Sequence, residues 1–192
     1  MRFTIYLCFI SLFLLSSCSI FKSGSPDEVV TIEKPCTGQK YQTSGKVFRA
    51  SANGESNILA GAEKKAMSRA RTIIAQNINV VLKGVEEDFM NLVSENNIES
   101  AREKFTSNTR TVMAQELSGA ITICEESTYN KKTEKYTAFV AMELSASKLA
   151  EKMAAQLQRQ QETLDEDSEL KVIYDYERFK ETFNEEMQKL GQ

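Results

Sequence analysis

The chain has no histidine and no tryptophan among its 192 residues, and it has only 4 cysteines, 2 prolines and 8 glycines. The missing histidine excludes Ser-His and Cys-His nucleophile pairs and every metal site built on imidazole. Gly45, Gly54 and Gly61 match neither the GxGxxG pattern nor the P-loop that holds phosphates. We therefore expect no metal, no cofactor and no enzymatic activity.

An excess of basic residues is also lacking. Lysine and arginine together number 24 against 27 acidic residues, which gives a formal net charge of −3. A protein that binds nucleic acid without a basic surface loses the main electrostatic contribution to its affinity. We therefore expect no nucleic-acid partner.

The N-terminal apolar run is too short to span a bilayer. Phe3–Leu15 is almost wholly apolar and follows Arg2, but at about 13 residues it falls short of the roughly 20 that a spanning helix needs. A charged start followed by a short apolar run is typical of a secretory signal. We expect residues 1–17 to be removed as a signal peptide, together with Cys8.

The segment Leu15-Ser16-Ser17-Cys18 ends this leader. It resembles the lipobox of bacterial lipoproteins, in which the chain is cut just before the cysteine and the cysteine is acylated. The resemblance predicts cleavage between Ser17 and Cys18 and lipidation of Cys18, with palmitate as one acyl chain. Two or three acyl chains anchor a protein stably without a transmembrane helix. The alternative is an ordinary signal peptide in which Cys18 is incidental.

Residues 18–35 mix serine, glycine, proline and charge without a sustained period, which is typical of a flexible tether. Ser19 stands where many Gram-negative lipoproteins carry the aspartate that retains them in the inner membrane. The resemblance therefore favours the outer membrane of the cell envelope. It leaves open whether the domain faces the periplasm or the cell surface.

Cys36 and Cys124 are the cysteines that remain once Cys8 is removed and Cys18 is lipidated. In the oxidising envelope, two such residues are candidates for a disulfide. The alternative is two unpaired cysteines that pack as small hydrophobic residues. A metal site is not expected, because the chain lacks histidine and any CxxC pair.

The segment Leu59–Val85 is the strongest structural signal. Its apolar residues fall on one side of a helix with ~100° per residue, where Glu63 and Asn77 interrupt them. The opposite side holds Lys64, Lys65, Ser68, Arg69, Thr72, Gln76, Asn79 and Lys83. We expect this segment to be the core helix, capped by Ser56. The preceding Gly45–Ala52 is a predicted strand that ends in a turn at Asn53-Gly54.

The rest of the chain predicts an α+β domain, in which a small antiparallel sheet of about three strands is covered on one face by the long helix and further helices. The expected domain spans residues 36–163, and residues 164–192 hold a C-terminal amphipathic helix. That helix packs on its own domain or, alternatively, on a partner subunit. The further predicted elements are helix Glu99–Leu117, a hairpin of Ala120–Thr128 with Tyr136–Leu144, a helix from Ser145 to about Gln161, and helix Tyr174–Leu190.

Three polar motifs are better explained by structure than by chemistry. Ser145-Ala146-Ser147-Lys148 matches SxxK, but the KTG and SDN partners of that motif are missing and Ser145 is placed to cap a helix. The acidic run Asp165–Glu169 lacks the glycine and the last glutamate of a calcium loop. Glu125 and Glu126 are neighbours on a strand, so they point to opposite faces.

The strand GKVFRASANGES, the alanines Ala62, Ala66 and Ala70, and the segments ITIC and KYTAFVAMEL together resemble the LPP-twenty lipoprotein family of bacterial envelope proteins. The likeness covers roughly Cys36–Leu157 and includes no catalytic signature. It implies a lipid-anchored α+β domain without enzymatic activity. We expect a structural or interaction module that binds an envelope protein or a second copy of itself. The alternative is a periplasmic carrier or sensor of a small apolar ligand.

Overall fold

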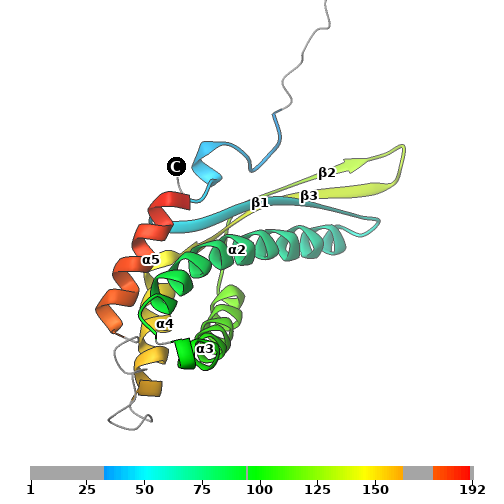
Figure 1. The fold of residues 1–192 in the computed structure, drawn as a ribbon. Helices are drawn as coiled ribbons and strands as arrows, with labels where there is room; N and C mark the ends of the chain where they lie inside the picture. Colours follow the sequence, from blue (N-terminus) through cyan, green and yellow to red (C-terminus); the bar gives the residue numbers. More distant parts are fainter. Residues whose placement is uncertain (1–32, 94, 162–174, 191–192) are drawn as a thin grey trace, which may run out of the picture. The chain divides into compact units, whose positions relative to one another are not determined.

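The computed structural model describes residues 33–93, 95–161 and 175–190 (Figure 1). These residues belong to one compact unit that begins at Glu33. The predicted signal peptide, Cys18, the tether up to residue 32 and the acidic run 165–169 lie outside the described residues. The elements in chain order are η1 (Gln39–Tyr41), β1 (Val47–Ser56), α2 (Leu59–Met90), η2 (Glu95–Asn97), α3 (Ile98–Ser118), β2 (Ile121–Asn130), β3 (Lys135–Ser145), α4 (Ala146–Gln161) and α5 (Tyr176–Leu190).

The three strands form one antiparallel sheet in the order β1-β3-β2. Phe48 lies opposite Leu144 at one end of the β1–β3 pair, and Ser56 lies opposite Tyr136 at the other. Alternate residues of β1 and β3 are buried beneath the helices, because successive side chains of a strand point to opposite faces. The predicted α+β fold and the predicted hairpin of β2 and β3 are confirmed.

Helix α2 covers one face of the sheet with a stripe of buried small and branched residues. The predicted end at Val85 is too early. Phe89 and Met90 continue the buried stripe past the acidic run 86–88, so burial keeps the helix going to Met90. The chain then leaves the helix and forms the short 3-10 helix η2, which ends at Asn97, before α3 begins. Helices α2 and α3 are therefore separate. Ile73, expected on the apolar side, is 36% exposed at the border of the stripe.

The predicted turn at Asn53-Gly54 is wrong, because β1 continues through both residues to Ser56. Gly54 is paired with Ala138, and a Cβ atom at this position would lie 2.4 Å from the Ala62 carbonyl oxygen. The glycine therefore permits close helix–sheet contact and does not turn the chain. The predicted cap is also wrong. Ile58 is the N-cap of α2, and no side chain caps it.

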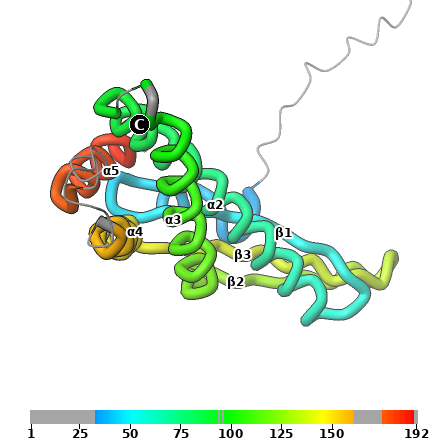
Figure 2. The backbone as a smooth tube through the Cα atoms, turned by 60° about the horizontal axis from the view of Figure 1, so that its bottom comes forward, coloured from blue at the N-terminus to red at the C-terminus, as the bar shows by residue number. Residues whose placement is uncertain are grey.

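The C-terminal helix packs on its own domain, as predicted. Phe179, Phe183 and Met187 of α5 are buried. The ring of Phe183 meets Phe48 of β1 edge-on, with 6.3 Å between the ring centroids. Helices α4 and α5 gather at one end of the sheet, and the tip of the β2–β3 hairpin extends at the other (Figure 2).

Candidate functional site

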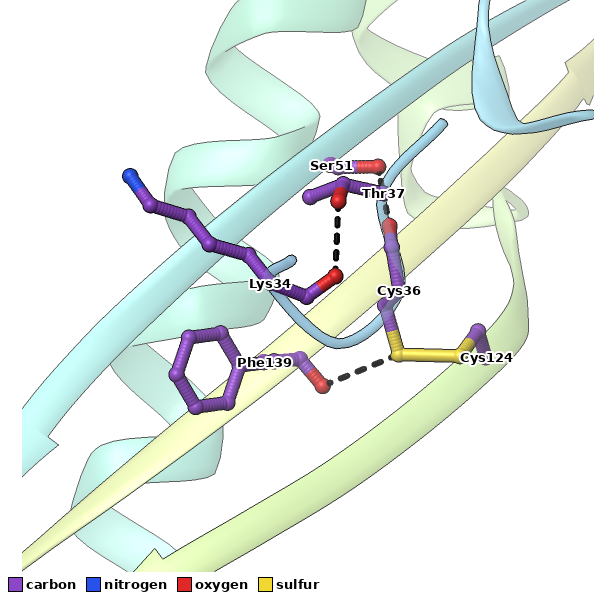
Figure 3. The surroundings of a disulfide bond; sticks show 6 residues. All are labelled: Lys34, Cys36, Thr37, Ser51, Cys124 and Phe139. Atoms are coloured by element: carbon purple, nitrogen blue, oxygen red, sulfur yellow. Dashed lines mark hydrogen bonds between the residues drawn. A yellow bond between two sulfur atoms is a disulfide. The ribbon is translucent and has the colours of Figure 1, made fainter. Parts of the chain in front are cut away.

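The N-terminal segment is fixed on the sheet face that the helices leave uncovered. Cys36 is joined to Cys124 of β2 by a disulfide, with 5.6 Å between the Cα atoms and a sequence separation of 88 residues (Figure 3). Cys124 lies opposite Ala141, whose neighbours Val140 and Met142 point into the helical core. The predicted pairing of Cys36 with Cys124 is therefore present in the structure, and it lies on the outer face.

The backbone around the disulfide is held by further contacts. Cys36 has φ of 55°, a left-handed conformation that is unusual for a residue with a side chain. The Ser51 hydroxyl donates a hydrogen bond of 2.6 Å to the Cys36 carbonyl, and the Thr37 hydroxyl donates one of 2.7 Å to the Lys34 carbonyl. The Sγ atom of Cys36 lies 3.5 Å from the Phe139 carbonyl oxygen, which is a packing contact because a disulfide sulfur has no proton to donate.

A surface hollow of about 480 Å³ lies beside this segment, between η1, β1 and α2. Arg49, on its wall, is bound to Glu143 of β3 at 2.7 Å and donates to the Lys40 carbonyl at 2.9 Å. The Thr43 hydroxyl binds both backbone groups of Arg49 and accepts a hydrogen bond from Asn77. These polar groups hold the N-terminal segment against β1. Among the residues that line the hollow, none forms a nucleophile–base pair.

A carboxylate stands near the disulfide. The ligand atoms of Cys36, Cys124 and Glu126 all lie within 4.8 Å of one another. Metal ions bind the thiolate form of cysteine, and both sulfurs are committed to the disulfide. The arrangement therefore supports a structural cross-link and not a metal centre.

The pKa of Lys189 is raised, because its ammonium group is hydrogen-bonded to the Glu186 carboxylate one turn earlier on α5. Both groups belong to an ion pair on the surface of the helix. This pair explains the raised pKa of Lys189 without any catalytic role.

The Ser145 hydroxyl accepts a weak hydrogen bond of 3.4 Å from the Lys148 backbone N–H, as a helix cap would.

Two structural features were missed by the sequence interpretation. The ion pair of Arg49 with Glu143 joins β1 to β3, and it depends on a strand register that neither segment reveals alone. The outer edge of β2 is the second feature, and it depends on the strand order. Cys18 and Ser17, the predicted lipidation and cleavage residues, lie outside the described residues.

No protein-family model, no curated protein and no solved structure matches the chain. The resemblance to the LPP-twenty family therefore stays a prediction. Within the described residues, no helix combines the length and the apolar run that a membrane span requires.

Proposed function

We propose that this protein is a lipid-anchored lipoprotein of the bacterial cell envelope, whose folded domain is a non-catalytic structural or interaction module at the outer membrane. The observation that carries the proposal is the segment Leu15-Ser16-Ser17-Cys18 directly after an apolar leader. Acylation at this cysteine attaches the chain to a membrane and needs no transmembrane helix.

The disulfide supports an envelope location. Structural disulfides form and persist in oxidising compartments and are rare in the reducing cytosol. Cys36 and Cys124 are at bonding distance, and Cys36 is 4% exposed. An exported protein would therefore keep this bond.

The position of the disulfide also suits a tethered domain. Cys36 follows the proposed tether. Its partner Cys124 lies on β2, which pairs with β3 on the side opposite β1. Tension on the tether reaches the sheet through this covalent bond, and it bypasses the weaker hydrogen bonds of Thr43 with Arg49. The link to the sheet is therefore covalent at the point where the tether ends.

The proposal is tested with Cys18→Ala in the full chain, produced in a Gram-negative host that is fed labelled palmitate. We expect the wild type to carry label and to sediment with the outer membrane, whereas Cys18→Ala carries no label and leaves the membrane fraction. Cys8→Ala is the matched control, because it makes the same chemical change inside the proposed leader. An unlabelled wild type, or a Cys18→Ala variant that stays with membranes, would contradict the proposal.

A further inference from the structure

The two outer edges of the sheet differ in how their backbone groups are covered. On β1, the Thr43 hydroxyl binds both the N–H and the C=O of Arg49. Further along the same edge, Arg69 donates to the Asn53 carbonyl at 2.8 Å and Lys65 donates to the Glu55 carbonyl at 2.9 Å. Side chains thus occupy the outward carbonyls of Arg49, Asn53 and Glu55 on the β1 edge, which hinders strand pairing there.

The outer edge of β2 has no such cover within the described part of the chain, where the backbone of β2 pairs only with β3. The outward groups follow from the alternation of an antiparallel ladder. The backbone N–H and C=O groups of Arg49 point away from β3, so those of Ala50 point toward β3. The backbone groups of its partner Met142 therefore point toward β1. The backbone groups of Ala141 then point toward β2, and those of its partner Cys124 point back toward β3. By alternation, Glu125, Ser127 and Tyr129 present their N–H and C=O groups on the outer edge of the sheet.

We propose that β2 pairs antiparallel with β2 of a second copy of this chain, so that the two sheets become one continuous sheet. The inference rests on the proposed function and names its partner. Regular pairing of β2 runs over residues 124–130, between the bulge at Thr122/Cys124 and the hairpin turn. Ser127 is the middle residue of this run. A two-fold axis at Ser127 therefore uses the whole regular segment.

Charge complementarity favours a second copy in this register. Glu125 lies opposite Tyr129 of the second copy, and Glu126 lies opposite its Thr128, so no two carboxylates are directly opposite. The two copies of Glu126 are diagonal neighbours, which is the one like-charge contact of this register. Lys131, the first residue after β2, follows at the diagonal position beside Glu125 of the other copy and reaches it with a long side chain. The two-fold axis makes this contact twice, so two unlike-charge contacts outweigh the single like-charge one. The strand is acidic before its centre, and Lys131 and Lys132 follow directly after its end in the hairpin turn, so an antiparallel pair brings these lysines toward the acidic half of the other copy.

The assembly is also closed. With much of β1 occupied, β2 is the barer of the two edges in the described part of the chain, and pairing of the β2 edges about a two-fold axis uses both of them. The pairing also places neighbouring side chains beside Tyr129, which is 49% exposed in the single chain. Anchoring of both copies to one membrane would raise their effective concentration.

The first test is Ser127→Cys in the full chain, oxidised mildly in intact cells and separated without reductant. Two residues at a hydrogen-bonded position lie about 5.5 Å apart between Cα atoms, within the range of roughly 4.4–6.8 Å that a disulfide requires. We expect a dimer band and a peptide in which two copies of residue 127 are linked. Asn53→Cys, exposed on the covered edge of β1, is the matched control and should remain monomeric.

The second test is Ser127→Pro, which removes an outward N–H and leaves the inward ladder of β2 with β3 intact. We expect loss of the dimer in native mass measurements and an unchanged circular dichroism spectrum, whereas Ser127→Thr keeps the dimer. A monomeric Ser127→Cys, a bond of residue 127 to a residue before Glu33, or a bond to another protein would overturn the proposal. Fractionation of the same cells reports the Cys18 anchor separately.

Discussion

Gly54 of β1 and Ala62 of α2 touch backbone to backbone. A Cβ atom on Gly54 would lie 2.4 Å from the Ala62 carbonyl oxygen and 2.6 Å from the Ala66 amide nitrogen. Both obstructing atoms belong to the helix backbone, which cannot rotate away as a side chain can. The contact also leaves no room for a ligand between sheet and helix at this point.

Gly54→Ala should therefore destabilise the domain by about 1–3 kcal/mol, as overpacking of a close contact typically does. Urea unfolding followed by circular dichroism measures the change. Gly119→Ala is the matched control, since a Cβ there has its nearest neighbour at 3.4 Å. The control should stay within about 0.5 kcal/mol of the wild type. Equal stability of both variants would mean that β1 and α2 are further apart than described.

The disulfide of Cys36 with Cys124 should stabilise the domain. Chain-entropy estimates for a loop of 88 residues give about 4–5 kcal/mol. Addition of a thiol reductant should lower the free energy of unfolding by that order. The double variant Cys36→Ser/Cys124→Ser should be less stable and insensitive to the reductant. Peptide mapping without reductant identifies the linked pair directly, and a wild type with two free thiols would contradict the assignment.

The ion pair of Arg49 with Glu143 should be coupled more strongly than an exposed pair. Its side chains are 28% and 22% exposed, and Arg49 makes a second hydrogen bond to Lys40. A double-mutant cycle of Arg49→Met and Glu143→Gln should give a coupling free energy of about 1 kcal/mol. The comparison pair is Lys135 with Glu55, which is 4.0 Å apart and more exposed. Its cycle should give a value near zero. A larger coupling for the exposed pair would reverse the expectation.

Helix α5 should contribute to the core and not form a separate appendage. Phe183 is fully buried and meets Phe48 edge-on. Phe183→Ala should cost about 3–5 kcal/mol, as removal of a buried ring does. Asn184→Ala, on the exposed side of the same helix, should change the unfolding free energy by less than about 0.5 kcal/mol. Similar stabilities of the two variants would place α5 outside the cooperative unit.

The sequence alone was sufficient for features that a short stretch encodes by itself. The apolar period of residues 59–85 predicts a helix, and the alternation around residues 120–144 predicts a hairpin, because side-chain spacing decides which residues one face can bury. The predicted disulfide needed only the small number of cysteines and the proposed export of the chain. The proposed lipid anchor rests on the sequence alone, since Cys18 lies outside the described residues.

Tertiary structure decided what depends on residues far apart in the chain. Asn53-Gly54 has the composition of a turn, yet pairing with β3 and the approach of α2 keep both residues extended. The acidic run 86–88 suggests a helix end, yet burial of Phe89 and Met90 carries α2 past it. The strand order β1-β3-β2, the side chains bound along β1 and, among the described residues, the unpaired outer backbone of β2 have no local pattern. They arise because strand pairing and helix packing bring together segments that are far apart in the chain, and no segment alone indicates which partner it will meet.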